Sequence, residues 1–136
     1  MKQKSIMIIE DDAALLRGLK DNFEARGYDV RTATDGQRGL YHLLADPPDL
    51  LLLDLMLPRM NGYDICKTAR SSDLHIPILM LTARSEEADV MRGLRCGADD
   101  YMTKPFDIEA LANRVEALSW LKPDKTTADA TEGTGV

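Results

Sequence analysis

The sequence has few cysteines, no excess of basic residues and no long apolar run, and each absence excludes a class of protein. Cys66 and Cys96 lie 30 residues apart without a second ligand pair nearby, so neither a zinc site nor a redox pair is expected. A formal charge of −6 argues against a surface that binds nucleic-acid phosphates. Apolar runs of four to six residues are far below the roughly 20 that cross a bilayer, and no cleavable signal is visible. We therefore expect a cytoplasmic protein whose cysteines stay reduced.

The length and the hydrophobic content indicate one domain. The chain has 136 residues, of which 44% are hydrophobic, enough for one core and too short for two. Apolar periodicity continues to Leu121 and then stops. We expect a domain over residues 1–121, followed by a flexible tail or truncated linker over 122–136.

Five apolar runs alternate strictly with five stretches of helical period. The predicted strands are 5–9, 28–33, 50–54, 77–83 and 100–106, and the predicted helices are 13–27, 38–46, 63–72, 85–97 and 107–121. This alternation predicts an α/β fold with a single doubly wound, five-stranded parallel sheet and helices on both faces. Four successive leucines, 50–53, fit this fold because a strand buried on both faces reads as a continuous apolar run.

Charged and polar residues stand where the predicted strands end. Glu10 and Asp11 follow the first run, Asp54 ends the third, Thr82 ends the fourth and Lys104 follows the fifth. Folds of this class bind ligands outside the carboxyl ends of their strands. Acids brought together there must bind a cation or take up protons, and a small set of carboxylate oxygens suits Mg²⁺. Asp54 is central enough to act as a nucleophile toward phosphorus.

Several of these residues have a simpler structural explanation. Asp12 is better explained as a first-turn acid that the helix dipole stabilises. Asp54 could cap the following helix, but Asn61 and Gly62 already supply turn chemistry there. Thr82 by itself would be an ordinary β-branched strand residue. Its position beside the acids favours a functional role.

Four motifs together resemble the receiver domain of two-component response regulators. They are IMIIEDD (6–12), LLLLDLMLPRMNG (50–62), PILMLTA (77–83) and DYMTKPF (100–106), in this order and at these spacings. The resemblance covers about residues 5 to 121. It implies a flavodoxin-like (CheY-like) fold with strand order 2-1-3-4-5, dependence on Mg²⁺ and phosphoryl transfer from a histidine kinase to an aspartate.

The resemblance also implies a role for each matching residue. Asp54 would be the phosphoacceptor, Lys104 the phosphate-contacting lysine, and the peptide before Pro105 would be cis. Thr82 would be the switch hydroxyl and Tyr101 the aromatic whose rotamer follows it. The metal would be held by Asp11 directly, by Glu10 through water, by Asp54 and by the backbone carbonyl of Met56.

Residues 97–107 with Arg114 most resemble receivers attached to winged-helix transcription factors, which dimerise through the face of the fourth helix, fifth strand and fifth helix. The resemblance implies three residue pairs across that face: Asp100 with Arg114, Arg95 with Glu116 in exchanged charge order, and Val90 with Ala110 where relatives carry charges. We expect a homodimer on activation whose salt dependence is weaker than usual. DNA would be bound by a missing output domain, not by this segment.

Two other functions are compatible with parts of the sequence. A stand-alone receiver would act by docking onto a partner protein. An aspartate-nucleophile phosphohydrolase of the haloacid dehalogenase type would carry a second acid two residues after Asp54, where this chain has Met56. The sequence therefore favours a phosphorylation-dependent signalling switch over an enzyme.

Overall fold

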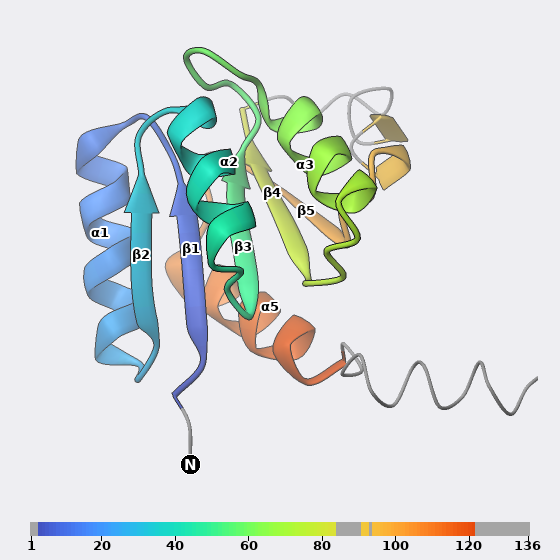
Figure 1. Ribbon diagram of the computed structural model, residues 1–136. Coiled ribbons are helices and arrows are strands. Elements are labelled where there is room, and N and C mark those ends of the chain that lie inside the picture. Colours follow the sequence, from blue (N-terminus) through green and yellow to red (C-terminus); the bar gives the residue numbers. More distant parts are fainter. Residues whose placement is uncertain (1–2, 84–90, 93, 122–136) are drawn as a thin grey trace, which may run out of the picture.

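Five parallel strands in the order β2-β1-β3-β4-β5 form the centre of the molecule (Figure 1). The computed structural model describes residues 3–83, 91–92 and 94–121. The strands are Ser5–Ile9 (β1), Asp29–Ala33 (β2), Leu50–Asp54 (β3), Ile78–Thr82 (β4) and Asp100–Thr103 (β5). The helices are Ala13–Ala25 (α1), Gly36–Ala45 (α2), Gly62–Ser71 (α3) and Ile108–Leu121 (α5). The doubly wound fold and the strand order 2-1-3-4-5 are confirmed.

Parts of two predictions fall outside the described residues. The predicted helix 85–97 is described only from residue 91, and residues 91–92 and 94–95 are helical. The predicted tail over 122–136 lies outside the described residues, as does Val90. Within the described ranges, no helix has the length and apolar character needed to cross a membrane.

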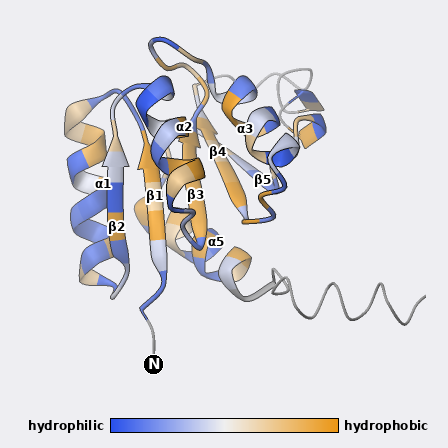
Figure 2. Ribbon diagram, viewed as in Figure 1, coloured by the Kyte–Doolittle hydropathy of each residue, from blue (hydrophilic) through white to orange (hydrophobic). Residues whose placement is uncertain are grey.

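Two separate hydrophobic clusters cover the two faces of the sheet. One joins Ile9, Leu51 and Leu53 to side chains of α2 and α3, such as Leu43 and Ile65. The other cluster joins alternate strand residues to α1 and α5, among them Ile8, Leu52, Phe23 and Val115. Figure 2 shows the apolar colour concentrated on β1, β3 and β4, whereas α1, α2 and α3 carry both polar and apolar colours.

The four leucines of β3 divide between these two clusters. Leu50 and Leu52 pack toward α1 and α5, and Leu51 and Leu53 pack toward α2 and α3. None of the four is more than 1% exposed. Because successive strand side chains point to opposite faces, a strand covered on both sides needs an apolar residue at every position. The strand therefore remains apolar until Asp54, at the edge of the sheet.

Side-chain caps fix where the helices begin. Asp12 is the N-cap of α1, and its carboxylate accepts hydrogen bonds from the backbone N–H groups of Ala14 and Leu15. Asp12 thus lies just before the helix as its cap, instead of within the first turn. Asn61 caps α3 by accepting from the Asp64 N–H. Asp54 is therefore not needed as a cap, in agreement with the sequence argument.

The start of α3 packs directly against the backbone that carries Asp54. A Cβ atom on Gly62 would lie 2.6 Å from the backbone oxygen of Asp54 and 2.9 Å from Cα of Leu55. Both neighbours are main-chain atoms, which cannot move aside without shifting the strand end. Glycine at position 62 therefore lets the helix approach Asp54 closely.

We predict that Gly62→Ala destabilises the protein by about 1–3 kcal/mol, because the added methyl group forces the end of β3 and the start of α3 apart. Gly18→Ala is the matched control, since a Cβ atom there meets nothing within 4 Å and the residue lies inside α1. The control should stabilise the protein by up to about 1 kcal/mol through helix propensity. Urea unfolding of both variants measures the difference. Equal effects would contradict the close approach.

Candidate functional site

Polar side chains lie at the carboxyl ends of four neighbouring strands, and these strand ends together form one edge of the sheet. Glu10 follows β1, Asp54 ends β3, Thr82 ends β4 and Lys104 follows β5. The strands run parallel, so these ends meet at the same edge (Figure 1). Backbone bonds fix the last two: the Lys104 N–H donates to the Thr82 carbonyl at 2.7 Å. The convergence that the sequence predicted is confirmed.

Three carboxylates lie together at this edge. One oxygen each of Glu10, Asp11 and Asp54 lies within 4.8 Å of the others. Glu10 and Asp54 are buried, with exposed fractions of 1% and 4%, whereas Asp11 is exposed. The group therefore has two acids inside the protein and one at its mouth.

Lys104 is the cation that faces the two buried acids. Its Nζ lies 2.6 Å from Oε1 of Glu10 and 3.6 Å from Oδ1 of Asp54. Burial acts to lower the pKa of Lys104, but the hydrogen bond to Glu10 and the charge of Asp54 outweigh it, so the pKa is raised. Lys104 is therefore a fixed positive charge. The peptide between Lys104 and Pro105 is cis, as predicted.

The remaining contacts hold the acids in place without neutralising them. The second oxygen of Glu10 accepts from the Asp12 N–H at 3.0 Å. Oδ1 of Asp54 accepts a long hydrogen bond of 3.4 Å from the Met56 N–H. Burial, followed by the charge of Glu10, raises the pKa of Asp54 to about 7, although Lys104 and the Met56 N–H act in the opposite direction. Among the described residues, Lys104 is the cation paired with these acids, and its charge does not compensate for both of them.

The donor set fits Mg²⁺. Hard oxygen ligands from a few carboxylates, one of them exposed at the mouth of the site, suit an ion that keeps several of its waters. A divalent cation would also offset the burial and the repulsion from Glu10 that together raise the pKa of Asp54. Glu10, Asp11 and Asp54 are the residues that would hold it. The role predicted for the Met56 backbone carbonyl stays a prediction, and the Met56 side chain is 55% exposed.

The two predicted switch residues lie on neighbouring strands. Thr82 is fully buried at the end of β4, directly beside the strand that carries Asp54. Tyr101, on β5, is half-buried and packs against the cluster under α2 and α3. The structure brings Thr82 to the site and places Tyr101 three residues before Lys104. Their switching roles stay predictions.

The residues predicted to form a dimer face are placed unevenly. Asp100 and Arg114 form an ion pair within one chain, with Nη1 and Oδ1 2.9 Å apart. Arg95 and Glu116 are exposed, and Ala110 is half-buried. Arg95 lines a pocket beside α3. In a dimer that paired Asp100 of one chain with Arg114 of the other, the ion pair within each chain would have to break or be shared between the two chains.

Residues 6–116 match the family model described as the response regulator receiver domain. The chain belongs to this family. It is 46% identical over 115 residues to the alkaline phosphatase synthesis transcriptional regulatory protein PhoP of Bacillus subtilis, covering 85% of this chain and 48% of that protein. It is 45% identical over 115 residues to the DNA-binding dual master transcriptional regulator RpaA of Synechocystis, covering 83% and 48%. This receiver chain therefore spans about half the length of these curated relatives.

Solved structures of receiver domains have the same fold. The receiver domain of the Francisella response regulator 1452 superposes with a TM-score of 0.85 at 30% identity, covering 89% of this chain and all of that one. A structure described as the BeF3-activated DrrB receiver domain has a TM-score of 0.80 at 30% identity, covering 86% and 97%. The family and fold that the sequence motifs implied are confirmed.

The sequence reasoning missed two features of the described residues. Cys66 and Cys96 are far apart in sequence, yet the Cys66 thiol donates to the Cys96 carbonyl at 3.3 Å. Both are free thiols. The second feature is a group of basic residues on α3 and residues 92–96. The sequence contains a pattern that could have predicted this group: Lys67, Arg70 and Ser71 have the same i, i+3, i+4 spacing as Arg92, Arg95 and Cys96.

We predict that Asp54→Asn stabilises the metal-free protein at pH 8. Between the ordinary carboxyl pKa near 4 and the folded value of about 7, the folded protein binds a proton at Asp54 that the unfolded chain has lost. Folding stability from this group therefore falls as the pH rises through that window and stays low above it. Asp54→Asn cannot ionise and does not lose this stability, so at pH 8 its free energy of unfolding should exceed that of the wild type by up to about 4 kcal/mol.

Urea unfolding in a chelator at pH 5 and pH 8 measures this effect. The advantage of Asp54→Asn should be small at pH 5 and larger at pH 8. Asp35→Asn, which changes an acid that caps α2 away from the cluster, is the control and should show no such gain with pH. An advantage for Asp54→Asn that does not grow with pH would contradict the raised pKa.

Proposed function

We propose that this chain is a phosphorylation-dependent signalling switch in which Asp54 accepts a phosphoryl group from a histidine kinase. The observation that carries the proposal is the position of Asp54, a buried carboxylate between Lys104, Glu10 and the exposed Asp11. The family and its regulatory relatives support the same function. The chain itself acts as the phosphoacceptor and catalyses its own transfer and slow hydrolysis, but no other reaction.

The chemistry needs an ionised Asp54. One carboxylate oxygen forms a bond to phosphorus, while the bond from phosphorus to the donor's leaving atom breaks and its electron pair stays with the donor. Mg²⁺, when bound by Glu10, Asp11 and Asp54, supplies positive charge that keeps the carboxylate ionised and neutralises phosphoryl oxygens. Lys104, already 3.6 Å from Asp54, interacts with another phosphoryl oxygen.

Phosphorylation would change the packing beside the site. The phosphoryl group adds about two negative charges and several strong acceptors to the strand next to Thr82. The Thr82 hydroxyl moves toward a phosphoryl oxygen, and Tyr101 moves into the space that it leaves. Because Tyr101 lies on β5, the change reaches the face next to α5, where dimerisation or docking takes place.

The relatives suggest how the signal is used. Two of them are named as transcriptional regulators, and this chain covers about half of their length. We infer that the response is transcriptional, through a DNA-binding domain that is not in this segment, inside the cytoplasm. A receiver that acts alone by docking onto a partner is the alternative. A haloacid dehalogenase-type hydrolase is disfavoured, because the residue two places after Asp54 is the exposed Met56.

We predict that beryllofluoride, a phosphoryl mimic, binds only with Mg²⁺ and not to Asp54→Asn. Amide chemical shifts of Thr82, Tyr101 and Lys104 report binding. Thr82→Val keeps the nucleophile and the shape of the side chain but removes the hydroxyl, so it should bind beryllofluoride while the shifts on α5 shrink severalfold. Beryllofluoride binding to Asp54→Asn would remove Asp54 from its role, and full α5 shifts in Thr82→Val would remove the hydroxyl from the switch.

We predict that beryllofluoride drives homodimerisation through the face of β5 and α5, and that Arg114→Glu weakens the dimer by placing like charges at Asp100. Arg31→Glu is the matched control, because Arg31 also pairs with an acid, Asp46 at 3.2 Å. Arg31 lies on β2, the outer strand on the far side of the sheet from β5. Exposed pairs contribute about 0.2 to 1 kcal/mol each, so the dimer constant should change only severalfold between low and moderate salt.

Sedimentation of the wild type and both variants, with and without beryllofluoride, measures dimerisation. An activated wild type that stays monomeric would favour the docking alternative. Equal weakening by the two substitutions would mean that the interface does not lie on this face.

A further inference from the structure

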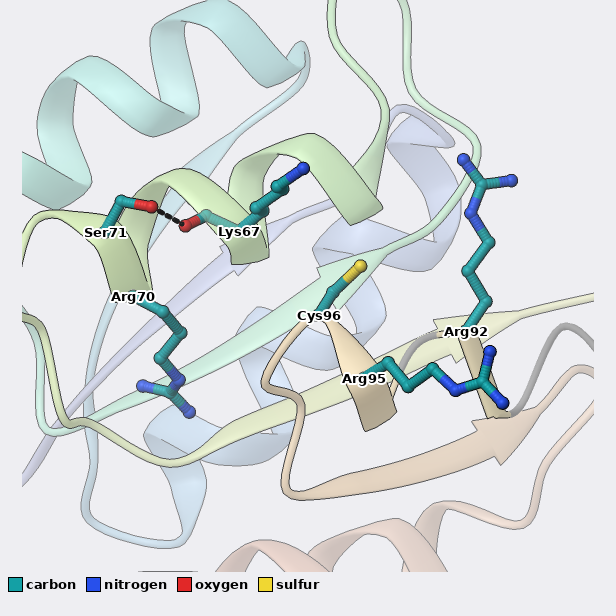
Figure 3. A pocket seen from close by; sticks show the side chains of 6 residues that line it. All are labelled: Lys67, Arg70, Ser71, Arg92, Arg95 and Cys96. Atoms are coloured by element: carbon teal, nitrogen blue, oxygen red, sulfur yellow. Dashed lines mark hydrogen bonds between the residues drawn. The ribbon is translucent and has the colours of Figure 1, made fainter.

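A basic pocket lies between α3 and the segment that carries Arg92, Arg95 and Cys96, and none of the three acids at the sheet edge lines it. Its volume is about 450 Å³, within the size range of small-molecule sites. Figure 3 shows the residues that line it: Lys67, Arg70, Ser71, Arg92, Arg95 and Cys96. Four of these six are cationic, although the whole chain has a formal charge of −6.

The two walls of the pocket are built in the same way. Each wall contributes residues at positions i, i+3 and i+4, which lie on one side of a helix. On the second wall, the Cys96 N–H donates to the Arg92 carbonyl at 3.1 Å, so Arg92 and Cys96 lie one helical turn apart. The positive side chains therefore come from two separate segments that face one space.

Arg70 holds the two walls together. Its guanidinium has five N–H donors, and all five make hydrogen bonds of 2.7–3.0 Å, to the carbonyls of Leu74, Ile76 and Gly97 and to the Asp99 carboxylate. A Cβ atom on Gly97 would lie 2.6 Å from Cγ of Arg70, so the contact is tight. Arg70 is therefore part of the frame and has no donor left for a ligand.

The other three cations keep their donors available. Within the part of the chain that the structure describes, Lys67 and Arg95 have no ion pair or side-chain hydrogen bond. The Arg92 guanidinium stacks on the Tyr63 ring, 4.2 Å from its centroid, and the N–H groups at its edge have no acceptor among the described residues. Within the described ranges, Arg70 is the one lining residue whose charge is matched by a carboxylate.

We propose that this pocket binds a small molecule that carries phosphoryl groups. Cations from two walls can be satisfied together by a group with several oxygens spread around one centre, whereas a single carboxylate offers two oxygens in one plane. The volume admits a pyrophosphate or a phosphate ester with a compact body. Asp54 is not among the lining residues, so the proposal does not rest on the proposed phosphorylation.

An acidic peptide is a poorer fit. A peptide spreads its carboxylates along an extended backbone, whereas these cations gather around one space of about 450 Å³. A base-stacking ligand is also disfavoured, because no aromatic ring lines the described pocket and the Tyr63 ring is covered by Arg92. The phosphoryl groups, and not an attached base, would therefore determine the affinity.

Protection of Cys96 from alkylation tests the proposal directly. Cys96 is half-exposed and lines the pocket, so a bound anion blocks its reaction with N-ethylmaleimide. Cys66 is buried, and burial raises the pKa of its thiol to about 11, so it reacts slowly and serves as an internal reference for unfolding. Inorganic phosphate, pyrophosphate, ADP and hexaglutamate are compared on the full chain, in a chelator at low salt.

Pyrophosphate at about ten times its Kd should slow alkylation of Cys96 about tenfold and leave Cys66 unchanged. Lys67→Gln and Arg95→Gln should each raise the Kd about tenfold, because each removes a charge-assisted bond. Arg17→Gln removes the same charge from the exposed side of α1, on the other face of the sheet, and should change the Kd less than twofold. If ADP binds as tightly as pyrophosphate, the phosphoryl groups, and not the attached nucleoside, determine the affinity.

Three outcomes of the alkylation experiment would overturn the proposal. They are no protection by any phosphoryl compound, equal loss of affinity in Arg17→Gln and Lys67→Gln, or stronger protection by hexaglutamate, which would make the pocket a docking site for an acidic peptide. Amide shift mapping on the wild type is an independent measurement that needs no variant. Pyrophosphate should shift Ser71 and Cys96, and shifts confined to Lys104 and Asp54 would place the anion at the acidic edge instead.

Discussion

The central constraint in this protein is the placement of two buried acids, Glu10 and Asp54, beside one lysine at the edge of a parallel sheet. Parallel strands bring their carboxyl ends together, so residues that are distant in sequence must share one small volume. Lys104 bonds closely to Glu10 and less closely to Asp54. Burial of Asp54 and the nearby charge of Glu10 outweigh the attraction of Lys104, so the pKa of Asp54 is raised.

This electrostatic imbalance is compatible with a stable fold because the rest of β3 is thoroughly apolar. Leu50 to Leu53 are buried on both faces by two independent clusters, and that burial holds the end of the strand in place. Gly62 then allows α3 to begin against the Asp54 backbone. The backbone of the site is therefore held in place, while its negative charge is only partly compensated. Binding of a cation or a phosphoryl group should change the electrostatic energy of the site more than its backbone positions.

Charge is separated between two regions of the molecule. The sheet edge gathers acids, while the space between α3 and residues 92–96 gathers cations. Arg70 connects the basic region to the loop before β5 by bonding to Gly97 and Asp99. Asp99 also accepts from the N–H of Ile78, the first residue of β4, whose last residue is Thr82. The two regions are therefore linked through one strand and its neighbouring loop.

The sequence by itself determined the elements and the main site. Apolar runs such as Leu50–Leu53 identify the buried strands, and the polar residues that follow the runs identify the edge where Glu10, Asp54 and Lys104 meet. Both can be read from the sequence, because hydrophobic periodicity and the direction of each strand depend only on residues that are close together in the chain. Only the tertiary structure decided how those charges pair and that the pKa of Asp54 is raised. It also decided that Arg70 is bonded at every donor while Lys67 has no side-chain partner among the described residues, because hydrogen bonding depends on neighbours that are distant in sequence.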